Sequence, residues 1–437
     1  MVVLWVLVVL AILTVALARQ TRLDNAIRIA AADRTVARWL ARAGVQRAIA
    51  EIAGDTSPAD GPSDSWYDDE SLFRQVELSG GAFSLCADRF YNVNRCAYGV
   101  IDEAGKINLN TAPYEVILAL PEMTETLASA IVEWRKSSQE SQDNERPDIT
   151  EQEQISAMSA EPGTIRTIRE LGLISEEATR EMLYGEDDNL NGILEANEND
   201  GDETLPLDNR DNVLDRGLLA YVTVYSYEHN QDGLGRKRIN INTADKSELE
   251  KLLGIETVYA NWIVENRPYL NSIADLLGDA ELMGTKETAT AGTTGAFGTG
   301  LEKENESIRP TIEVFRQIAD QITITNIPII PGRVNINTAS EVVLRTLPGM
   351  NEQIAAATVQ TRAGLENGFA GIAEILTVTG MSVTQFRKMA GMITVRSNVF
   401  TIRSFGRAER TGIRHNVEAV VSRGEARPKI LYWKENR

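Results

Sequence analysis

The first 18 residues carry no charged side chain, and the apolar run from Val2 to Ala18 constrains the fold more than any other feature of the sequence. A run of about this length is just sufficient to cross a bilayer as a helix. Residues 19–52 are rich in Ala, Leu, Ile and Arg, lack proline and contain Gly44 as their only glycine. We therefore expect one helix of about 50 residues, on the order of 80 Å long, with a lipid-compatible first third and an amphipathic remainder.

A cleavable signal peptide is the alternative for this segment, with Ala16-Leu17-Ala18 as its cleavage site. Signal peptides begin with a basic stretch and are not normally followed by a continuing helix. The apolar run has no basic residue before it, and the helical pattern continues beyond Arg19. These features favour an uncleaved membrane helix. The charges that flank the helix do not specify its orientation in the membrane.

The overall charge argues against several classes of function. Acidic residues outnumber basic ones by 63 to 44, giving a net charge of −19. Such a chain repels nucleic acid and anionic membrane surfaces unless basic side chains are segregated. Only two histidines occur in the 437 residues, which disfavours a histidine-based metal or acid–base site. Because the sequence also lacks a glycine-rich phosphate loop and a nucleophile elbow, we expect a non-enzymatic protein with no catalytic residues.

The acidic residues are concentrated between Glu186 and Asp215, where eleven Asp or Glu side chains accompany one basic residue, Arg210. Residues 187–198 match the calcium-loop pattern D-x-[DN]-x-[DN]-G-x5-E, with Gly192 at the sharp turn. A solvated acidic loop is the alternative. The spacing predicts a Ca²⁺ site with ligands at Asp187, Asn189, Asn191, Ile193, Glu195 and Glu198.

The chain after the predicted loop does not continue as a helix. Residues 199–202 and Pro206 break the exit helix that a calcium sensor needs. We therefore expect a fixed structural site that stabilises the acidic segment. Five further acidic residues are candidates to extend this site or to form a second one: Asp200, Asp202, Asp208, Asp211 and Asp215.

Cys86 and Cys96 are the only cysteines, and they flank a segment with two turn-prone asparagines. A β-hairpin there would bring the two thiols together as a disulfide, which requires an oxidising compartment. Two free thiols in a core are the alternative. The amino-terminal helix favours the disulfide, since it places the chain outside the cytoplasm.

A 29-residue block occurs three times without gaps, at Ile107–Arg135, Ile239–Arg267 and Val334–Arg362. Each block predicts a short strand, a helix opened by a Thr, a turn and a second helix, which is the layout of a helix-hairpin-helix unit. In the third block, Thr338 and Glu341 fit a capping box. The blocks share the residues Asn108/Asn240/Asn335, Asn110/Asn242/Asn337, Thr111/Thr243/Thr338, Ala112/Ala244/Ala339, Leu120/Leu252/Leu347, Ala128/Ala260/Ala355, Val132/Val264/Val359 and Arg135/Arg267/Arg362.

Helix-hairpin-helix units often bind DNA through a hairpin with two glycines. Here Thr124, Glu256 and Asn351 occupy the second glycine position, and Glu122 replaces the first glycine in the first block. Glu256 would present the wrong charge to phosphate. The sequence therefore favours a packing or docking role over DNA binding.

The remaining segments predict an α+β fold in which helical material interrupts a sheet. Early strands are expected at 82–87, 97–102 and 107–110, one strand at Leu218–Ser226, and late strands at 393–405, 415–422 and 429–434. The expected organisation is an assembly helix (1–53), the first part of a pilin-like domain (54–110), a helical insert with the calcium loop (111–238), a second insert with two repeats (239–391) and strands that complete the sheet (392–437).

The chain resembles minor pseudopilin K of the bacterial type II secretion system (general secretion pathway protein K). The resemblance rests on the Val2–Ala18 run with its helical continuation, on Ile101–Pro113, on Tyr221–Ser226 before the second Ile-Asn-Ile-Asn-Thr-Ala, and on the strands after Met392. It implies a pilin-like domain with a large helical insertion and bound calcium. Trp5 stands where major pilins carry a Glu that pairs with a neighbouring subunit, which suits a position at the tip.

The resemblance further implies single-pass anchoring in the bacterial inner membrane, with most of the chain in the periplasm. Its implied role is to cap or initiate the pseudopilus tip and support protein export, with other minor pseudopilins as partners through the helix and exported proteins as further contacts. No nucleic acid is expected. Two alternatives stay open: a membrane-anchored helix-hairpin-helix protein for DNA uptake, and a minor pilin of a type IV pilus.

Overall fold

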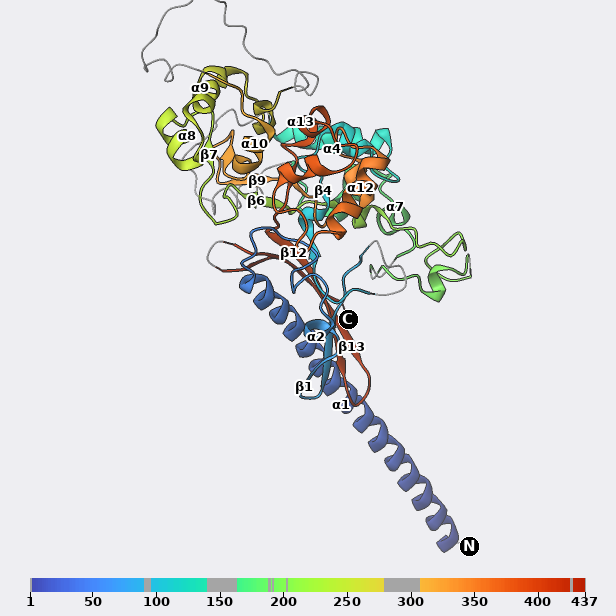
Figure 1. Ribbon diagram of the computed structural model, residues 1–437. Coiled ribbons are helices and arrows are strands. Elements are labelled where there is room, and N and C mark those ends of the chain that lie inside the picture. The colour runs from blue at the N-terminus through green and yellow to red at the C-terminus, as the bar shows by residue number, and fades with distance from the viewer. Residues whose placement is uncertain are drawn as a thin grey trace, which may run out of the picture.

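The computed structural model describes residues 2–89, 96–139, 163–187, 190, 192–201, 203–278, 307–424 and 427–436. A single helix, α1 (Val2–Gly54), forms the axis of the molecule (Figure 1). Its amino-terminal half projects alone, and its carboxy-terminal half packs against the sheet. The buried residues of the helix accordingly begin only at Asp33. Gly44 permits close contact there, since a Cβ on it would lie 2.2 Å from Ser404 Oγ.

The sheet has six antiparallel strands in the order β1-β2-β12-β13-β14, with β3 also paired to β12. Its core holds apolar side chains of α1 together with Trp66, Phe73, Phe83 and Phe400. The two ends of the chain thus build one layer, as expected for an α+β fold with an inserted helical region. The strands are β1 (Val76–Leu78), β2 (Gly81–Leu85), β3 (Ile101–Asp102), β12 (Val399–Ala408), β13 (Arg414–Ser422) and β14 (Lys429–Asn436), and α2 (Glu70–Phe73) precedes β1.

Three helical units lie between β3 and β12, and each is closed by a two-stranded parallel pair. They share one continuous hydrophobic core. The first unit contains β4 (Ile107–Asn108), α3 (Tyr114–Leu118), α4 (Glu125–Gln139), α6 (Leu171–Ile174), α7 (Arg180–Tyr184) and β5 (Val222–Thr223). The second contains β7 (Ile239–Asn240), α8 (Lys246–Leu253), α9 (Thr257–Asn266), α10 (Ile312–Ile318) and β8 (Ile322–Thr323).

The third unit lies directly above the sheet (Figure 1). It contains β10 (Val334–Asn335), α11 (Glu341–Arg345), α12 (Glu352–Ala363), the 3-10 helix η9 (Ile372–Thr377), α13 (Val383–Met389) and β11 (Ile393–Thr394). An antiparallel pair, β6 (Tyr227–His229) with β9 (Ile329–Pro331), links the units.

Several strands differ from the expectation. The strand expected at Leu218–Ser226 begins as a 3-10 helix (Leu218–Ala220) and forms only β5, and the one expected at 97–102 is reduced to β3. The strand expected at 107–110 in the pilin-like part is β4, which pairs with β5 of the first unit and not with the large sheet. The strand expected at 393–405 is split, because β11 pairs with β10 and only β12 enters the sheet. Both boundaries of the inserted region therefore move outward from 111 and 391, since the strands next to each boundary pair inside a helical unit.

The expected capping box at Thr338 and Glu341 is also wrong. The cap of α11 is Ser340, whose side chain accepts a hydrogen bond from Val343 N. Thr338 instead donates its hydroxyl to Asp102 Oδ2. In the other two units the cap likewise lies two residues after the shared Thr, at Pro113 and Asp245, and the helix begins at the next residue.

Candidate functional site

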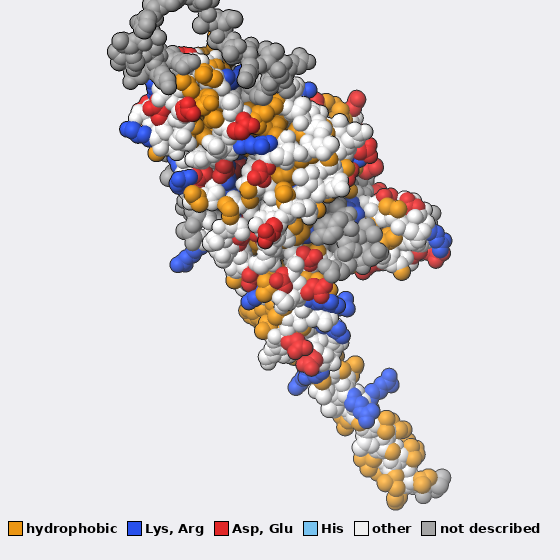
Figure 2. Space-filling view, in the orientation of Figure 1, with side chains coloured by type: hydrophobic (Ala, Val, Ile, Leu, Met, Phe, Trp, Pro, Cys, Tyr) orange, Lys and Arg blue, Asp and Glu red, His pale blue; other side chains and the backbone are white. Residues whose placement is uncertain are grey.

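The amino-terminal half of α1 is an uncovered apolar surface. Val2, Trp5 and Ile12 are 79, 73 and 64 % exposed, and Figure 2 shows orange side chains around this end of the helix. Among the described residues, α1 is the one helix long and apolar enough to cross a membrane. Because soluble proteins rarely expose so large an apolar patch, this surface requires lipid or protein to cover it.

The shared arginine of each repeat binds the backbone of its own unit. Arg362 Nη1 donates to the carbonyls of Ile336 and Ala339, both at 2.7 Å. Arg135 makes the same two bonds in the first unit, at 2.8 and 2.9 Å. Arg267 donates to the equivalent carbonyls of the second unit. These guanidinium groups satisfy carbonyls at the turn after the first strand, so their recurrence has a structural cause.

The shared asparagines also have structural roles. In all three units the first Asn accepts a hydrogen bond at 2.9 Å from the backbone N–H of the second. The second Asn donates to a distant carbonyl, which is Ile165 O for Asn110 and Phe369 O for Asn337. These contacts fix the strand-to-helix turn, so the repeated asparagines hold the unit together.

The hairpin turns keep one backbone conformation with different residues. Glu122, Gly254 and Gly349 occupy equivalent positions, with φ of 58°, 65° and 87°. A Cβ on Gly349 would lie 2.7 Å from Gln385 O, so the hairpin of the third unit packs against α13. Gly349 is therefore explained by close contact within the unit.

The predicted calcium segment lies beside the sheet. Asp187 and Glu198, at the two ends of the predicted loop, are 3 % and 1 % exposed. Asp187 Oδ2 accepts a 2.8 Å bond from Gly192 N, and Gly192 has the left-handed φ of 71° expected for the turn. Glu195 and Glu198 form a reciprocal capping box. Two buried carboxylates at the ends of a tight loop fit the hard oxygen donors that calcium prefers; Asn189 and Asn191 lie outside the described residues, and Ile193 is described.

The wider acidic segment is ordered by its own carboxylates. Glu186 accepts bonds from Asn209 N and Asp215 N, and burial raises its pKa despite these bonds. Asp208 accepts from Asp200 N and Gly201 N. Of the further candidate ligands, Asp211 caps a turn through Val213 N, and Asp202 lies outside the described residues. These carboxylates bind backbone N–H groups, and the described ones do not converge on one point.

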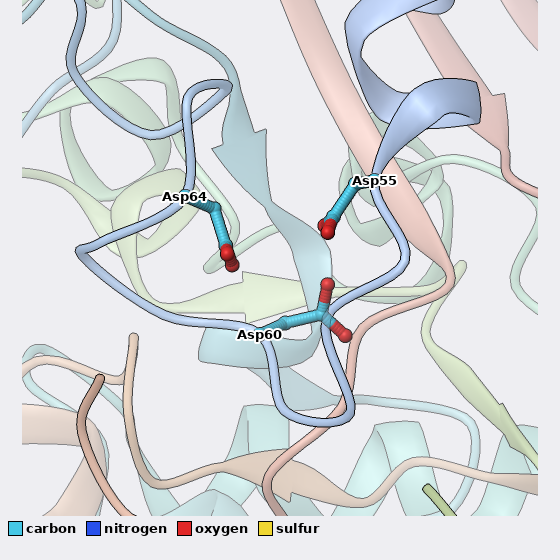
Figure 3. Close-up of side chains that lie close together, drawn as sticks. All are labelled: Asp55, Asp60 and Asp64. Carbon is cyan, nitrogen blue, oxygen red and sulfur yellow. The ribbon is translucent and has the colours of Figure 1, made fainter. Parts of the chain in front are cut away.

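A second group of carboxylates was not identified from the sequence. Asp55, Asp60 and Asp64 face one another where α1 gives way to the loop before the sheet, as Figure 3 shows. Burial raises the pKa of Asp60 to about 7, although Arg423 opposes the shift. Arg423 Nη2 lies 3.0 Å from Asp55 Oδ2 and 2.7 Å from Asp60 Oδ1. The guanidinium offsets part of the negative charge of this group, which makes it a charged junction between α1 and the β13–β14 turn.

Cys86 and Cys96 are joined by a disulfide, with Cα atoms 5.7 Å apart. An isolated antiparallel bridge between Ala87 and Ala97 lies beside it. The disulfide holds the segment after β2, from which Asp88 reaches the predicted calcium segment through Arg216.

Comparison with known proteins identifies one motif family. Residues 332–394, which comprise the third unit, match the helix-hairpin-helix motif. The chain is similar to endonuclease/exonuclease/phosphatase family domain-containing protein 1 of Bos taurus, Mus musculus and Homo sapiens, each 28 % identical over 177 residues. That similarity covers 39 % of this chain and 29 % of each relative, so it spans less than a third of their length.

Among solved structures, the chain is similar to the GspK-GspI-GspJ complex from the type 2 secretion system of enterotoxigenic Escherichia coli. The sequence identity is 11 % and the TM-score 0.36, over 96 % of this chain and 99 % of the other.

Proposed function

We propose that this chain is a non-enzymatic minor pseudopilin of a type II secretion system. It is anchored by α1 in the inner membrane, with the bulk of the chain in the periplasm. It caps or initiates the pseudopilus tip and supports protein export, with other minor pseudopilins as partners. The observation that carries this proposal is α1 itself, whose carboxy-terminal half supports the sheet while its apolar amino-terminal half is uncovered.

The division of α1 explains how such a subunit would assemble. Residues 2–18 suit lipid before assembly and neighbouring helices within a fibre afterwards, because both environments are apolar. The helical units lie at the opposite end of the molecule (Figure 1), where they are available to cap a tip or to meet exported protein.

The helical units support a docking role. Their repeated polar residues are used inside each unit. The described turns at residues 120–123, 253–256 and 347–351 contain no Lys or Arg.

Calcium is proposed as a structural ligand of this chain. Asp187, Glu195 and Glu198, with the main chain at Ile193, would hold the ion, together with Asn189 and Asn191 of the pattern. When bound, the ion supplies positive charge that offsets repulsion within the acidic segment. Asp187 and Glu198 carry this proposal, since they are buried at the two ends of the loop.

Membrane fractionation tests the anchoring. The full chain, expressed in a Gram-negative host, is expected to resist alkaline extraction and to be digested by protease added to the periplasm. Extraction of the chain by alkali, or protection from the protease, would contradict the proposed topology.

A membrane-anchored DNA-binding protein is the second candidate, because the third unit matches a motif family that includes DNA-binding hairpins. A minor pilin of a type IV pilus would be anchored in the same way. The two candidates are distinguished by whether protein export or pilus assembly fails when the chain is absent. A gel-shift titration with a 20-base-pair duplex at low salt tests the DNA hypothesis. Binding in the micromolar range that weakens steeply with salt would favour it.

A further inference from the structure

A groove runs between α1 and the edge of the sheet, near the lower end of the globular part. It encloses about 720 Å³ and is lined by Arg34, Thr35 and Arg38 of α1, Ile413, Arg414 and His415 at the start of β13, and Glu435 of β14.

The groove is cationic on a strongly acidic chain. Three arginines and one histidine line it, and among its described lining residues Glu435 alone is a carboxylate. Partial burial would raise the pKa of Glu435, but hydrogen bonds from Arg42, Trp433 and Arg38 lower it to about 2, so this carboxylate is ionised. It is also shared, because Arg38 and Arg42 each lie 2.7 Å from it. Arg34 and Arg414 have no ion-pair partner among the described residues, so positive charge remains for a ligand.

An exposed tryptophan lies next to the groove. Trp39 is 62 % exposed, and the guanidinium of Arg42 lies 5.1 Å from its ring centroid. Arg42 also lies 5.9 Å from the ring of Trp433. Its ion pair with Glu435 holds this stack in place. Tryptophan and arginine are the residues most enriched among the energetic centres of protein interfaces, particularly where they are rigidly held.

We propose that this groove, with Trp39 at its side, docks an acidic helix of a neighbouring subunit. The inference rests on the proposed function, since it supplies the contact by which the assembly helix recognises a partner. Arg34 and Arg38 are one helical turn apart and project in the same direction. They therefore match carboxylates spaced by four residues on a helix lying alongside α1.

The position of the groove selects protein over lipid as the occupant. At 1.5 Å per residue, Arg34 lies about 24 Å beyond Ala18 along the axis. Phospholipid headgroups at the end of the apolar segment do not reach that far. The same axis carries the uncovered apolar half of α1, so one neighbouring helix would cover both surfaces.

Fluorescence anisotropy with the full chain in detergent micelles tests the proposal. The probe is a fluorescein-labelled helical peptide with glutamates at i and i+4 beside leucines, compared with the same peptide carrying glutamines. We expect saturable binding of the glutamate peptide, with affinity at least about tenfold higher than that of the glutamine peptide, equivalent to about 1.4 kcal/mol.

The variants and controls are matched by residue type. Arg34→Glu combined with Arg414→Glu is expected to lower the affinity for the glutamate peptide by about tenfold or more. Trp39→Ala is expected to lower this affinity by roughly fivefold. Arg316→Glu on α10 and Trp134→Ala on α4 are exposed controls and should bind as the wild type does. Equal affinity for the two peptides, or unchanged peptide binding by the groove variants, would overturn the proposal. It would also be overturned if the wild-type chain bound a DNA duplex and the groove variants lost that binding.

The same material separates this inference from the proposed function. Peptide binding by a chain that fails to insert in membranes would remove the pseudopilin proposal and leave the groove. Membrane insertion without selective peptide binding would remove the docking groove and leave the pseudopilin proposal.

Discussion

Arg216 forms a bidentate ion pair with Asp88, with Nε 2.7 Å from Oδ2 and Nη2 2.9 Å from Oδ1. The pair connects the end of the acidic segment to the disulfide-bonded segment after β2. Both side chains are largely buried, at 8 % and 12 % exposed. A Cβ on Gly192 would lie 2.1 Å from Asp88 Oδ1, so the predicted calcium loop is packed directly on this pair.

Arg216→Ala is expected to lower the free energy of unfolding by roughly 3 kcal/mol, because it leaves the Asp88 carboxylate buried without its partner. Urea unfolding followed by circular dichroism measures the change. The matched control is Arg210→Ala, whose pair with Glu203 is exposed at 63 % and 71 % and contributes about 0–1 kcal/mol. Equal effects of the two substitutions would contradict the role given to the buried pair.

Calcium should raise the melting temperature of the wild-type chain in proportion to saturation. A ligand at 100 times its dissociation constant stabilises the bound state by about 2.7 kcal/mol. Asp187→Ala and Glu198→Ala are each expected to abolish the calcium-dependent rise in melting temperature, as measured by calorimetry with and without chelator. Glu203→Ala, which removes an exposed carboxylate of the same segment that is not a candidate ligand, serves as the control. A rise in melting temperature that survives in both ligand variants would exclude the proposed site.

Glu122→Gly is expected to stabilise the protein by up to about 1 kcal/mol, since glycine adopts a positive φ without the steric penalty of a Cβ. Glu122 has a φ of 58° and replaces the glycine found in the other two units. Gly349→Ala is the reciprocal change and should destabilise, because its Cβ meets Gln385 O. Thermal unfolding of the two variants checks both signs, and a destabilised Glu122→Gly would refute the backbone argument.

Asn335→Ala should destabilise more than Asn240→Ala, although the two residues are equivalent in the repeat. Asn335 Nδ2 lies within hydrogen-bond distance of Asp60 O, Asp102 Oδ2 and Ser397 Oγ, whereas Asn240 Nδ2 donates to Asn326 Oδ1. Leaving buried acceptors unsatisfied costs about 1–3 kcal/mol. Denaturant titration of both variants gives the difference, and equal losses would show that the link between the third unit and the sheet adds no stability.

Glu228 provides a pH-dependent prediction. It is buried against Arg238, Arg333 and Arg396, and although burial opposes the shift, these charges lower its pKa from 4.5 to about 2. A lowered carboxyl pKa stabilises the folded state above the unfolded value and loses this contribution as pH falls towards the folded value. The free energy of unfolding of Glu228→Gln should therefore fall furthest below that of the wild type at pH 7, and the difference should shrink below about pH 4.5. Glu203→Gln, at an exposed site, should show no such trend; a pH-independent deficit at Glu228 would contradict the assignment.

The sequence predicted the elements whose signals are local. α1 spans Val2–Gly54 because its apolar and Arg/Ala-rich stretches contain no helix breaker. The three repeats were recognisable because Asn108, Arg135 and their equivalents recur at fixed spacing. The closing strands of the units were not predicted as such, because each is a short apolar-Thr pair whose parallel partner lies far away along the chain.

The docking groove was also beyond reach from sequence. Its charge balance depends on Arg38 meeting Glu435, a contact between residues 397 positions apart. Arginines on α1 indicated only an amphipathic helix. The junction of Asp55, Asp60 and Asp64 was missed for the same reason, since Arg423, which pairs with two of these carboxylates, comes from the turn between the last two strands.

The most direct test of the central claim is complementation of secretion in a host strain that lacks this gene. The wild-type chain should restore export of a reporter enzyme to the medium. Leu10→Arg with Leu13→Arg, on the exposed apolar half of α1, should abolish export while the chain is still produced. Leu252→Arg on α8, an exposed leucine of the second unit, is the matched control for the added charge. Normal export with the two α1 substitutions, or no dependence of export on this chain, would contradict the account.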